Sequence, residues 1–204
     1  MTIHSNGTKD QQPVRVLGIG GSTRRGSTSR ALLRTALDLV EQAGGHAVLA
    51  DVRELDLPIF DDDLPLEAYP SRLGELIAEA RAADAYIFCS PTYHGTVSGA
   101  VKNALDLLNV LGDDAPPYLG GKPVGLMAVG GGGAANVLTS LHHAARALNG
   151  LTIPTTVISS GSAIRDGEVS DEAVQRRLRS LVDELLDLAV RLRRSTADQA
   201  ALPR

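Results

Sequence analysis

The sequence is poor in the residues that build disulfides, metal clusters and aromatic surfaces. Its 204 residues include one cysteine and no tryptophan, and aromatic residues amount to 3%. A single cysteine, Cys89, cannot form an intramolecular disulfide and cannot by itself hold an iron–sulfur or zinc cluster. Because Cys89 closes an apolar run, we expect it to be a small buried strand residue.

Long apolar runs and an excess of positive charge are also missing. No apolar run approaches the ~20 residues that a membrane-spanning helix requires, and residues 1–12 are too polar for the core of a signal peptide. The net charge of −4 comes without the basic stripe that a nucleic-acid or anionic-membrane partner would require. The sequence therefore predicts a cytoplasmic protein with neither kind of partner.

The composition that is present suits one globular domain. Hydrophobic residues make up 43% and charged residues 22% of the chain, and the length fits a single well-buried core better than two. We expect a disordered leader at residues 1–12, one domain at residues 13–194 and a flexible tail at residues 195–204.

Strand-like apolar runs alternate with helical periods along the domain. Strands are predicted at residues 14–20, 46–52, 85–89, 122–129 and 152–158. Helices are predicted at residues 29–42, 71–83, 100–110, 134–148 and from a cap at Ser170 through Leu188, with an irregular segment at residues 53–69. This alternation predicts a parallel sheet with helices on both faces. Five βα units in so short a chain favour a flavodoxin-like three-layer α/β sandwich with strand order 2-1-3-4-5.

The loop after the first strand is rich in glycine, hydroxyl groups and arginine. Residues 18–30 read Gly-Ile-Gly-Gly-Ser-Thr-Arg-Arg-Gly-Ser-Thr-Ser-Arg, and the free N–H groups at the start of the next helix suit a phosphate. A Walker A loop would need lysine where Ser27 stands, and the dinucleotide fingerprint would need glycine where Thr23 stands. Asp51 could still imitate the ribose-binding acid of a dinucleotide site. The hydroxyl and guanidinium donors favour a terminal phosphomonoester.

The loops after the third and fourth strands should meet the first loop, because ligands of such sheets lie beyond the carboxyl ends of the strands. Residues 90–99 read Ser-Pro-Thr-Tyr-His-Gly-Thr-Val-Ser-Gly, with Ser98 as the expected cap of the next helix, and residues 130–133 are four glycines. Glycines let the backbone approach a flat ligand, although a flexible turn is the simpler interpretation.

No segment predicts a metal site. Residues 61–63 are adjacent aspartates on an expected loop and point in different directions, and His142 and His143 are helix neighbours that point apart. Lys102 and Asp106 are four residues apart, so we expect a pair on a helix surface or at a subunit contact.

Three of these segments together resemble a known family. Residues 21–29, 90–94 and 99–108 resemble, in order and context, the motifs of the flavodoxin-like NAD(P)H-dependent FMN reductases, a family that includes flavin, quinone, chromate and azo-dye reductases. The similarity extends over residues 14–193. It implies an enzyme that takes hydride from NADPH or NADH at the N5 atom of FMN and passes electrons to a flavin, quinone or similar small acceptor. No side chain is expected to be catalytic, because the hydride chemistry belongs to the cofactor.

The resemblance also implies which residues contact FMN. The expected phosphate donors are Ser22, Arg24, Ser27, Thr28 and Ser29, whereas Arg25 and Arg30 are expected to face solvent. The expected contacts to the ribityl chain and the ring come from Pro91, Thr92, Tyr93, His94, Gly95, Gly130, Gly131, Gly132 and Gly133. The second motif, often P-E-Y-N in the chromate and quinone branch, reads Pro-Thr-Tyr-His here, which is more similar to the flavin-reductase branch.

Two other classes of function are compatible with a flavin site. A flavodoxin-type electron carrier usually has an acidic rim and aromatic residues beside the flavin, which the 3% aromatic content disfavours; a flavin-binding protein without turnover is the second alternative. One open flavin face implies ping-pong kinetics, and FMN acting as a dissociable substrate would equally permit a sequential mechanism.

The resemblance also bears on partners. Family members are usually dimers or tetramers, so a homodimer or homotetramer is expected, with the helices at residues 100–110 and 134–148 as candidate contacts. A flavin-dependent monooxygenase is a candidate partner besides the small-molecule acceptor.

Overall fold

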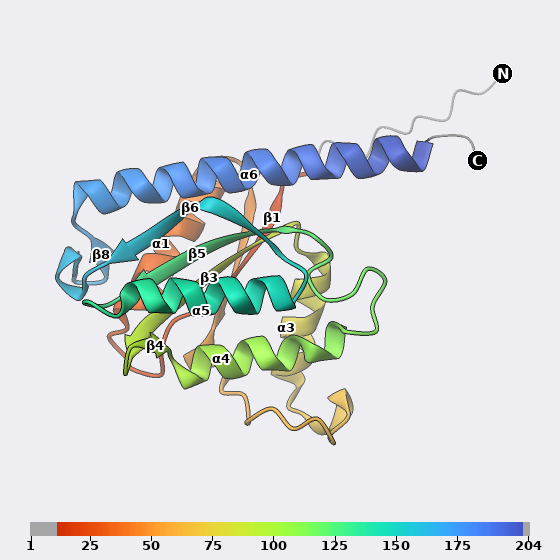
Figure 1. The fold of residues 1–204 in the computed structure, drawn as a ribbon, viewed down its shortest axis with the longest axis horizontal. Coiled ribbons are helices and arrows are strands. Elements are labelled where there is room, and N and C mark those ends of the chain that lie inside the picture. The colour runs from red at the N-terminus through yellow and green to blue at the C-terminus, as the bar shows by residue number, and fades with distance from the viewer. Residues whose placement is uncertain (1–11, 202–204) are drawn as a thin grey trace.

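A parallel sheet of five strands forms the centre of the structure (Figure 1), a computed structural model that describes residues 12–201. The five strands are β1 (Arg15–Gly20), β2 (His46–Asp51), β3 (Ala85–Tyr93), β5 (Pro123–Val129) and β6 (Leu151–Ser159). They run in the order β2-β1-β3-β5-β6 with every neighbouring pair parallel. Counted among the parallel strands alone, this is the predicted order 2-1-3-4-5, and the flavodoxin-like sandwich is confirmed.

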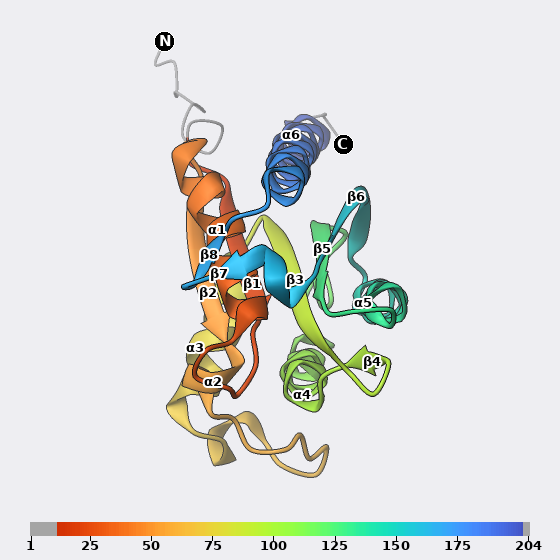
Figure 2. The same cartoon turned by 90° about the vertical axis from the view of Figure 1, so that its left-hand side faces the viewer.

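Helices cover both faces of the sheet (Figure 2). On one face lie α1 (Thr28–Gln42) and α6 (Glu172–Ala201), and on the other lie α3 (Ser71–Ala82), α4 (Gly99–Asp106) with the 3-10 turn η2 (Leu107–Leu111), and α5 (Ala134–Ala147). Because apolar residues of each helix face the sheet, the strands are buried on both sides. β5 is buried along its whole length.

Several predicted boundaries were wrong. The helix expected at residues 100–110 divides into α4 and η2. The irregular segment expected at 53–69 contains the 3-10 turn η1 (Leu66–Ala68) and overlaps α2 (Val52–Leu55), whose first residue was expected to end a strand. Ser170 does not cap α6; the Oδ1 atom of Asp171 accepts the N–H groups of Ala173 and Val174 at 2.8 and 3.2 Å. Helix α6 continues to Ala201, into the stretch where a tail was expected.

Two small hairpins were not predicted. β4 (Thr96–Val97) pairs antiparallel with the end of β3, and β7 (Ile164–Arg165) pairs with β8 (Glu168–Val169) after the 3-10 turn η3 (Gly161–Ala163). The second hairpin packs against α1 and α6 through Ile164 and Val169. Leader residues 1–11 and tail residues 202–204 lie outside the described residues.

Helix α6 completes one edge of the sheet and holds the start of the described chain. The Thr155 N–H of edge strand β6 donates to Glu184 Oε2 at 3.1 Å, and Arg177 Nε donates to the Thr156 carbonyl at 2.9 Å. Further along α6, Arg193 forms two hydrogen bonds with the Asp84 carboxylate. Its guanidinium also donates to the carbonyls of residues 12 and 13 at 2.8 and 3.0 Å, so α6 joins both ends of the described chain.

Candidate functional site

The three predicted loops meet at the carboxyl edge of the sheet. The Gly21 N–H donates to the Cys89 carbonyl at 3.3 Å, which ties the first loop to β3. A Cβ atom built on Gly133 would lie 3.0 Å from the Gly95 Cα atom, so the turn of the β3–β4 hairpin touches the glycine loop at residues 130–133. These contacts confirm that the loops, which are distant in sequence, lie together at this edge of the sheet.

Buried hydroxyl groups line the start of α1. Ser22, Ser27 and Ser29 are 3%, 5% and 1% exposed, respectively. Ser27 caps the helix by accepting the Arg30 N–H at 3.2 Å, and its Oγ atom lies 3.0 Å from that of Ser29. Serine hydroxyls beside the free N–H groups of a 15-residue helix form a suitable environment for an anion.

The three arginines of the first loop differ in their contacts. Arg24 and Arg25 are exposed, and the Arg24 Nη2 atom donates to the Gly26 carbonyl at 2.8 Å. Arg30 was expected to face solvent, and this was wrong. Its side chain is 26% exposed and forms an ion pair with Asp51 at 3.1 Å, because β2 ends directly beside the loop and supplies the carboxylate.

Pro91, Thr92 and Tyr93 belong to strand β3 rather than to a loop. The turn of the hairpin is formed by His94 and Gly95, with φ angles of +50° and +81°. Two successive residues at positive φ form the tight turn that matches the twist of a hairpin, and glycine adopts this conformation without strain. Tyr93 is 47% exposed, and His94 is also exposed. Both side chains are therefore accessible to a ligand.

The Thr92 hydroxyl faces the glycine loop. Its Oγ1 atom is buried and has no hydrogen-bond partner among the described residues. A Cβ atom on Gly130 would lie 2.3 Å from this oxygen, so only glycine permits the approach of the two loops. Gly131 and Gly132 are exposed and have open space around them. This arrangement presents bare backbone beside an unsatisfied hydroxyl group.

Cys89 lies beneath the first loop and is fully buried. Burial raises the pKa of its thiol well above its ordinary value, and the Sγ atom donates to the Ser29 carbonyl at 3.3 Å. The predicted role as a small buried strand residue is confirmed.

Sequence reasoning missed Arg53, which donates to the Thr23 carbonyl of the first loop. The two residues are 30 positions apart, and no motif links them. Asp51, considered above as a ribose-binding acid, instead accepts from Arg30 and from the Arg53 N–H at 3.1 and 3.0 Å.

Comparison with known proteins identifies the family. Residues 14–164 match the sequence model described as NADPH-dependent FMN reductase. The chain belongs to this family. The chain is 31% identical over 165 residues to the NADPH azoreductase of Bacillus sp. (strain OY1-2), covering 78% of this chain and 84% of that protein. It is 27% identical over 202 residues to the probable NADPH:quinone oxidoreductase 2 of Oryza sativa subsp. japonica, covering 94% and 97%.

A solved structure shares the fold of this FMN reductase. RosB with bound 8-demethyl-8-formylriboflavin-5′-phosphate has a TM-score of 0.71 and 20% sequence identity, covering 92% of this chain and 86% of that chain. Family membership makes the protein an NAD(P)H-dependent oxidoreductase with FMN as its flavin. The residues present fit that group, since buried hydroxyls stand at a helix N-terminus and an unpartnered Thr92 Oγ1 faces bare glycine backbone.

Among residues 12–201 there is no group of three histidine, cysteine, aspartate or glutamate side chains that could hold a metal ion, nor a helix long and apolar enough to cross a membrane.

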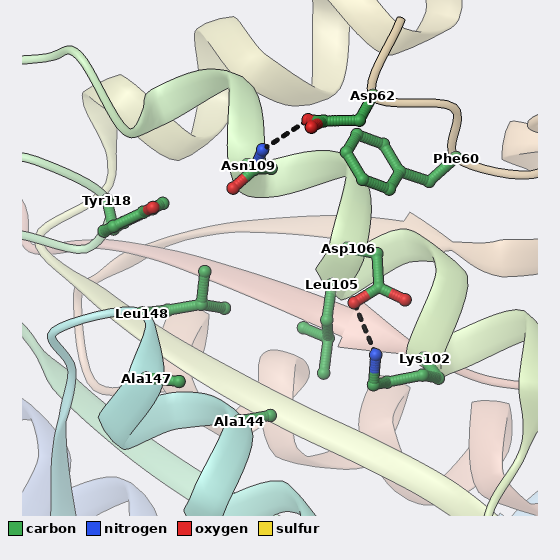
Figure 3. A pocket seen from close by; sticks show the side chains of 10 residues that line it. All are labelled: Phe60, Asp62, Lys102, Leu105, Asp106, Asn109, Tyr118, Ala144, Ala147 and Leu148. Carbon is green, nitrogen blue, oxygen red and sulfur yellow. Dashed lines mark hydrogen bonds and ion pairs between the residues drawn. The ribbon is translucent and has the colours of Figure 1, made fainter.

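A groove of about 460 Å³ lies between α4, η2 and α5 (Figure 3), where Lys102 Nζ contacts Asp106 Oδ1 at 2.5 Å.

Proposed function

We propose that the FMN phosphate binds at the start of α1 and that the isoalloxazine ring lies between the β3–β4 hairpin and residues 130–133. The observation that carries this proposal is the cluster of buried serine hydroxyls at one end of the site. Its hydroxyl donors suit a phosphate monoester, while the exposed Tyr93 and the glycine loop offer a surface for a flat ring. Thr92 Oγ1 would donate to a polar atom of the ring.

When bound, FMN would supply the hydride and electron-transfer chemistry that links NADPH or NADH to an acceptor. The residues of the chain bind and orient it. Ser22, Ser27 and Ser29 hold the phosphate end, and the glycine loop leaves the ring face accessible to both substrates in turn. One face visited alternately supports ping-pong kinetics.

The second substrate is proposed to be a small molecule such as a quinone or an azo compound. The names of the relatives, an azoreductase and a probable quinone oxidoreductase, support this class. A flavin-dependent monooxygenase partner would instead require reduced FMN to leave the protein. Retention of FMN through gel filtration, with turnover that needs no added flavin, favours the small acceptor.

The test is an absorbance spectrum of the purified protein followed by anaerobic titration with NADPH and NADH. Bleaching of bound FMN by either nucleotide, and steady oxidation of that nucleotide with a quinone or azo dye, supports the proposal. Tightly bound, reducible FMN without turnover would indicate a carrier or a flavin-binding protein instead. Arg34→Ala, on the exposed face of α1, serves as a control that should leave both rates unchanged.

We also propose that the groove of Figure 3 receives a second copy of the chain. Ala144 and Ala147 form its flat α5 wall, while Phe60 stands on the opposite side. The adjacent Ile59 is 80% exposed, a large apolar side chain suited to burial against a neighbouring molecule. In a twofold dimer each copy would present Ile59 to the groove of the other, since such contacts are self-complementary.

Charge supports this choice of occupant. The groove contains the carboxylates of Asp62 and Asp106, of which Asp106 is paired with Lys102, and the exposed Arg146 lies on the α5 helix that forms one wall. A twofold contact brings acidic and basic groups of opposite copies together. Ala147→Arg, which fills the groove with charge, should convert a dimer to a monomer in light scattering; Ala173→Arg on the opposite face should not. A wild-type monomer would contradict the proposal.

A further inference from the structure

The first loop turns three of its backbone carbonyls toward arginine side chains. The Thr23 carbonyl accepts from Arg53 Nη1, the Arg25 carbonyl from Arg30 Nη2 at 2.6 Å, and the Gly26 carbonyl from Arg24 Nη2 at 2.8 Å. Two of these arginines, Arg30 and Arg53, lie outside the loop, on α1 and α2. The loop is therefore held by residues of two other elements, α1, which follows β1, and α2, which follows β2.

Asp51 joins the two outside arginines. Its Oδ2 atom pairs with Arg30 Nη1 at 3.1 Å, and its Oδ1 atom accepts the Arg53 N–H at 3.0 Å. Because Asp51 is only 4% exposed, its charge is not free to rotate into solvent, and both oxygens hold residues that in turn hold the loop. Asp51 stands at the end of β2, paired with Gly20 in the sheet, so the sheet itself fixes this support.

Holding the carbonyls has a consequence for the N–H groups. In a planar trans peptide the C=O and N–H bonds point in opposite directions. Each held carbonyl therefore turns the N–H group of the following residue, Arg24, Gly26 or Ser27, away from the guanidinium nitrogen that the carbonyl contacts. Among the described residues none of these three N–H groups donates a hydrogen bond to the protein, which leaves them available to an anion.

We infer that Arg30 and Arg53 are positioning residues of the phosphate site, and that they make binding depend on the phosphate of FMN. They keep the carbonyl oxygens of the loop away from the anion and its N–H groups directed toward it. This inference rests on the proposed FMN site and deepens it, because it assigns the preference for FMN over riboflavin, which lacks the phosphate, to residues that need not touch the ligand.

The charge balance supports the same assignment. Asp51 is a buried carboxylate next to a site for an anion, and alone it would repel a phosphate. The Arg30 guanidinium neutralises it at 3.1 Å. Arg53 adds a further positive charge at the Thr23 carbonyl, so the surroundings of the loop remain favourable to a dianion.

The test compares the dissociation constants of FMN and riboflavin by fluorescence titration of the flavin-depleted full-length protein. For Arg53→Ala we expect FMN to bind about tenfold more weakly, as for one lost charged hydrogen bond, and riboflavin to bind as in the wild type. Arg53→Lys, which can still donate to the Thr23 carbonyl, should recover most of the FMN affinity. Arg34→Ala removes an exposed arginine of α1 and should change neither constant.

Arg30→Met provides a second variant, with the unfolding free energy measured alongside, because it leaves Asp51 unpaired. The double variant Arg30→Met, Asp51→Asn removes the repulsion and should regain part of the lost FMN affinity. Equal loss for FMN and riboflavin in Arg53→Ala would indicate a general structural effect and overturn the inference, as would unchanged FMN affinity. If the wild-type protein bound neither flavin, both the proposed function and this inference would fail. If the wild-type protein bound FMN and the variants bound FMN with the same dissociation constant, only this inference would fail.

Discussion

Arg24 is the exposed arginine of the first loop whose guanidinium reaches back to the Gly26 carbonyl. Its remaining donors are free to meet a phosphate without a change of backbone. We predict that Arg24→Ala weakens FMN binding by about 1.5–3 kcal/mol, the contribution of a charged hydrogen bond. Titrations of the Arg24→Ala and Arg25→Ala variants with FMN check this. Arg25→Ala loses the same charge but keeps the backbone carbonyl of residue 25, to which Arg30 donates. Equal affinities in the two variants would contradict the assignment.

Cys89 offers a second prediction at the scale of one side chain. Its pKa is raised by burial, so the native thiol should stay protonated and react slowly with a chromogenic disulfide reagent at neutral pH. Reaction should become rapid and stoichiometric in urea. Because the folded-state pKa lies above the unfolded value, the contribution of this thiol to stability is complete below the unfolded pKa and is lost as the pH rises through the folded pKa. Fast labelling of the native protein would show that the site beneath the loop opens.

At the scale of the elements, the contact between β3 and the glycine loop depends on one missing side chain. Gly130→Ala would place a Cβ atom 2.3 Å from Thr92 Oγ1 and 2.6 Å from Thr92 Cβ. We expect the free energy of unfolding to fall by about 1–3 kcal/mol through overpacking, together with weaker flavin binding. Gly131→Ala is the matched control, since its Cβ would have nothing within 4 Å. Denaturant titrations that show the same stability for both variants would exclude the proposed clash.

The elements also show what can be predicted from the sequence. Apolar runs and helical periods located every parallel strand, because burial on both faces leaves a continuous signal. The strand expected to end at Cys89 continues through Pro91, which pairs with Val129. The chain then reverses direction through a two-residue turn at His94 and Gly95, which connects β3 to β4. The hairpin of β7 and β8 could have been predicted, because Asp166-Gly167 is a favoured turn dipeptide.

Contacts between residues distant in sequence could not be predicted in this way. The serines of the first loop were predicted from a motif, and the structure places them together and buried. The pairing of Arg30 with Asp51 depends instead on β1 and β2 being neighbours, with Gly20 opposite Asp51. Sequence periodicity carries no information on that register, so Arg30, in the first turn of a helix, was interpreted as facing solvent.

At the scale of the whole molecule, Arg193 connects α6 to the loop before β3 and to the first described residues. Its two bonds to Asp84 and two bonds to backbone carbonyls form a partly buried network, with both side chains 23% exposed. We predict that Arg193→Ala lowers the free energy of unfolding by about 1–3 kcal/mol. Arg179→Ala, at an exposed position of the same helix, should change it by less than about 0.5 kcal/mol. Urea denaturation of both variants measures the difference.

Helix α6 lies beyond the segment that the family model matches, which ends at residue 164. Yet Leu178, Leu181 and Leu185 are fully buried within the core shared with α1. A chain shortened to the family segment would lose these leucines and expose the apolar residues of α1 and of the sheet that belong to the same core. The edge of β6 would also lose Glu184 and Arg177 as partners. Unpaired strand edges recruit other chains, so the shortened protein should precipitate on expression. The segment that the family model matches is thus shorter than the folding unit.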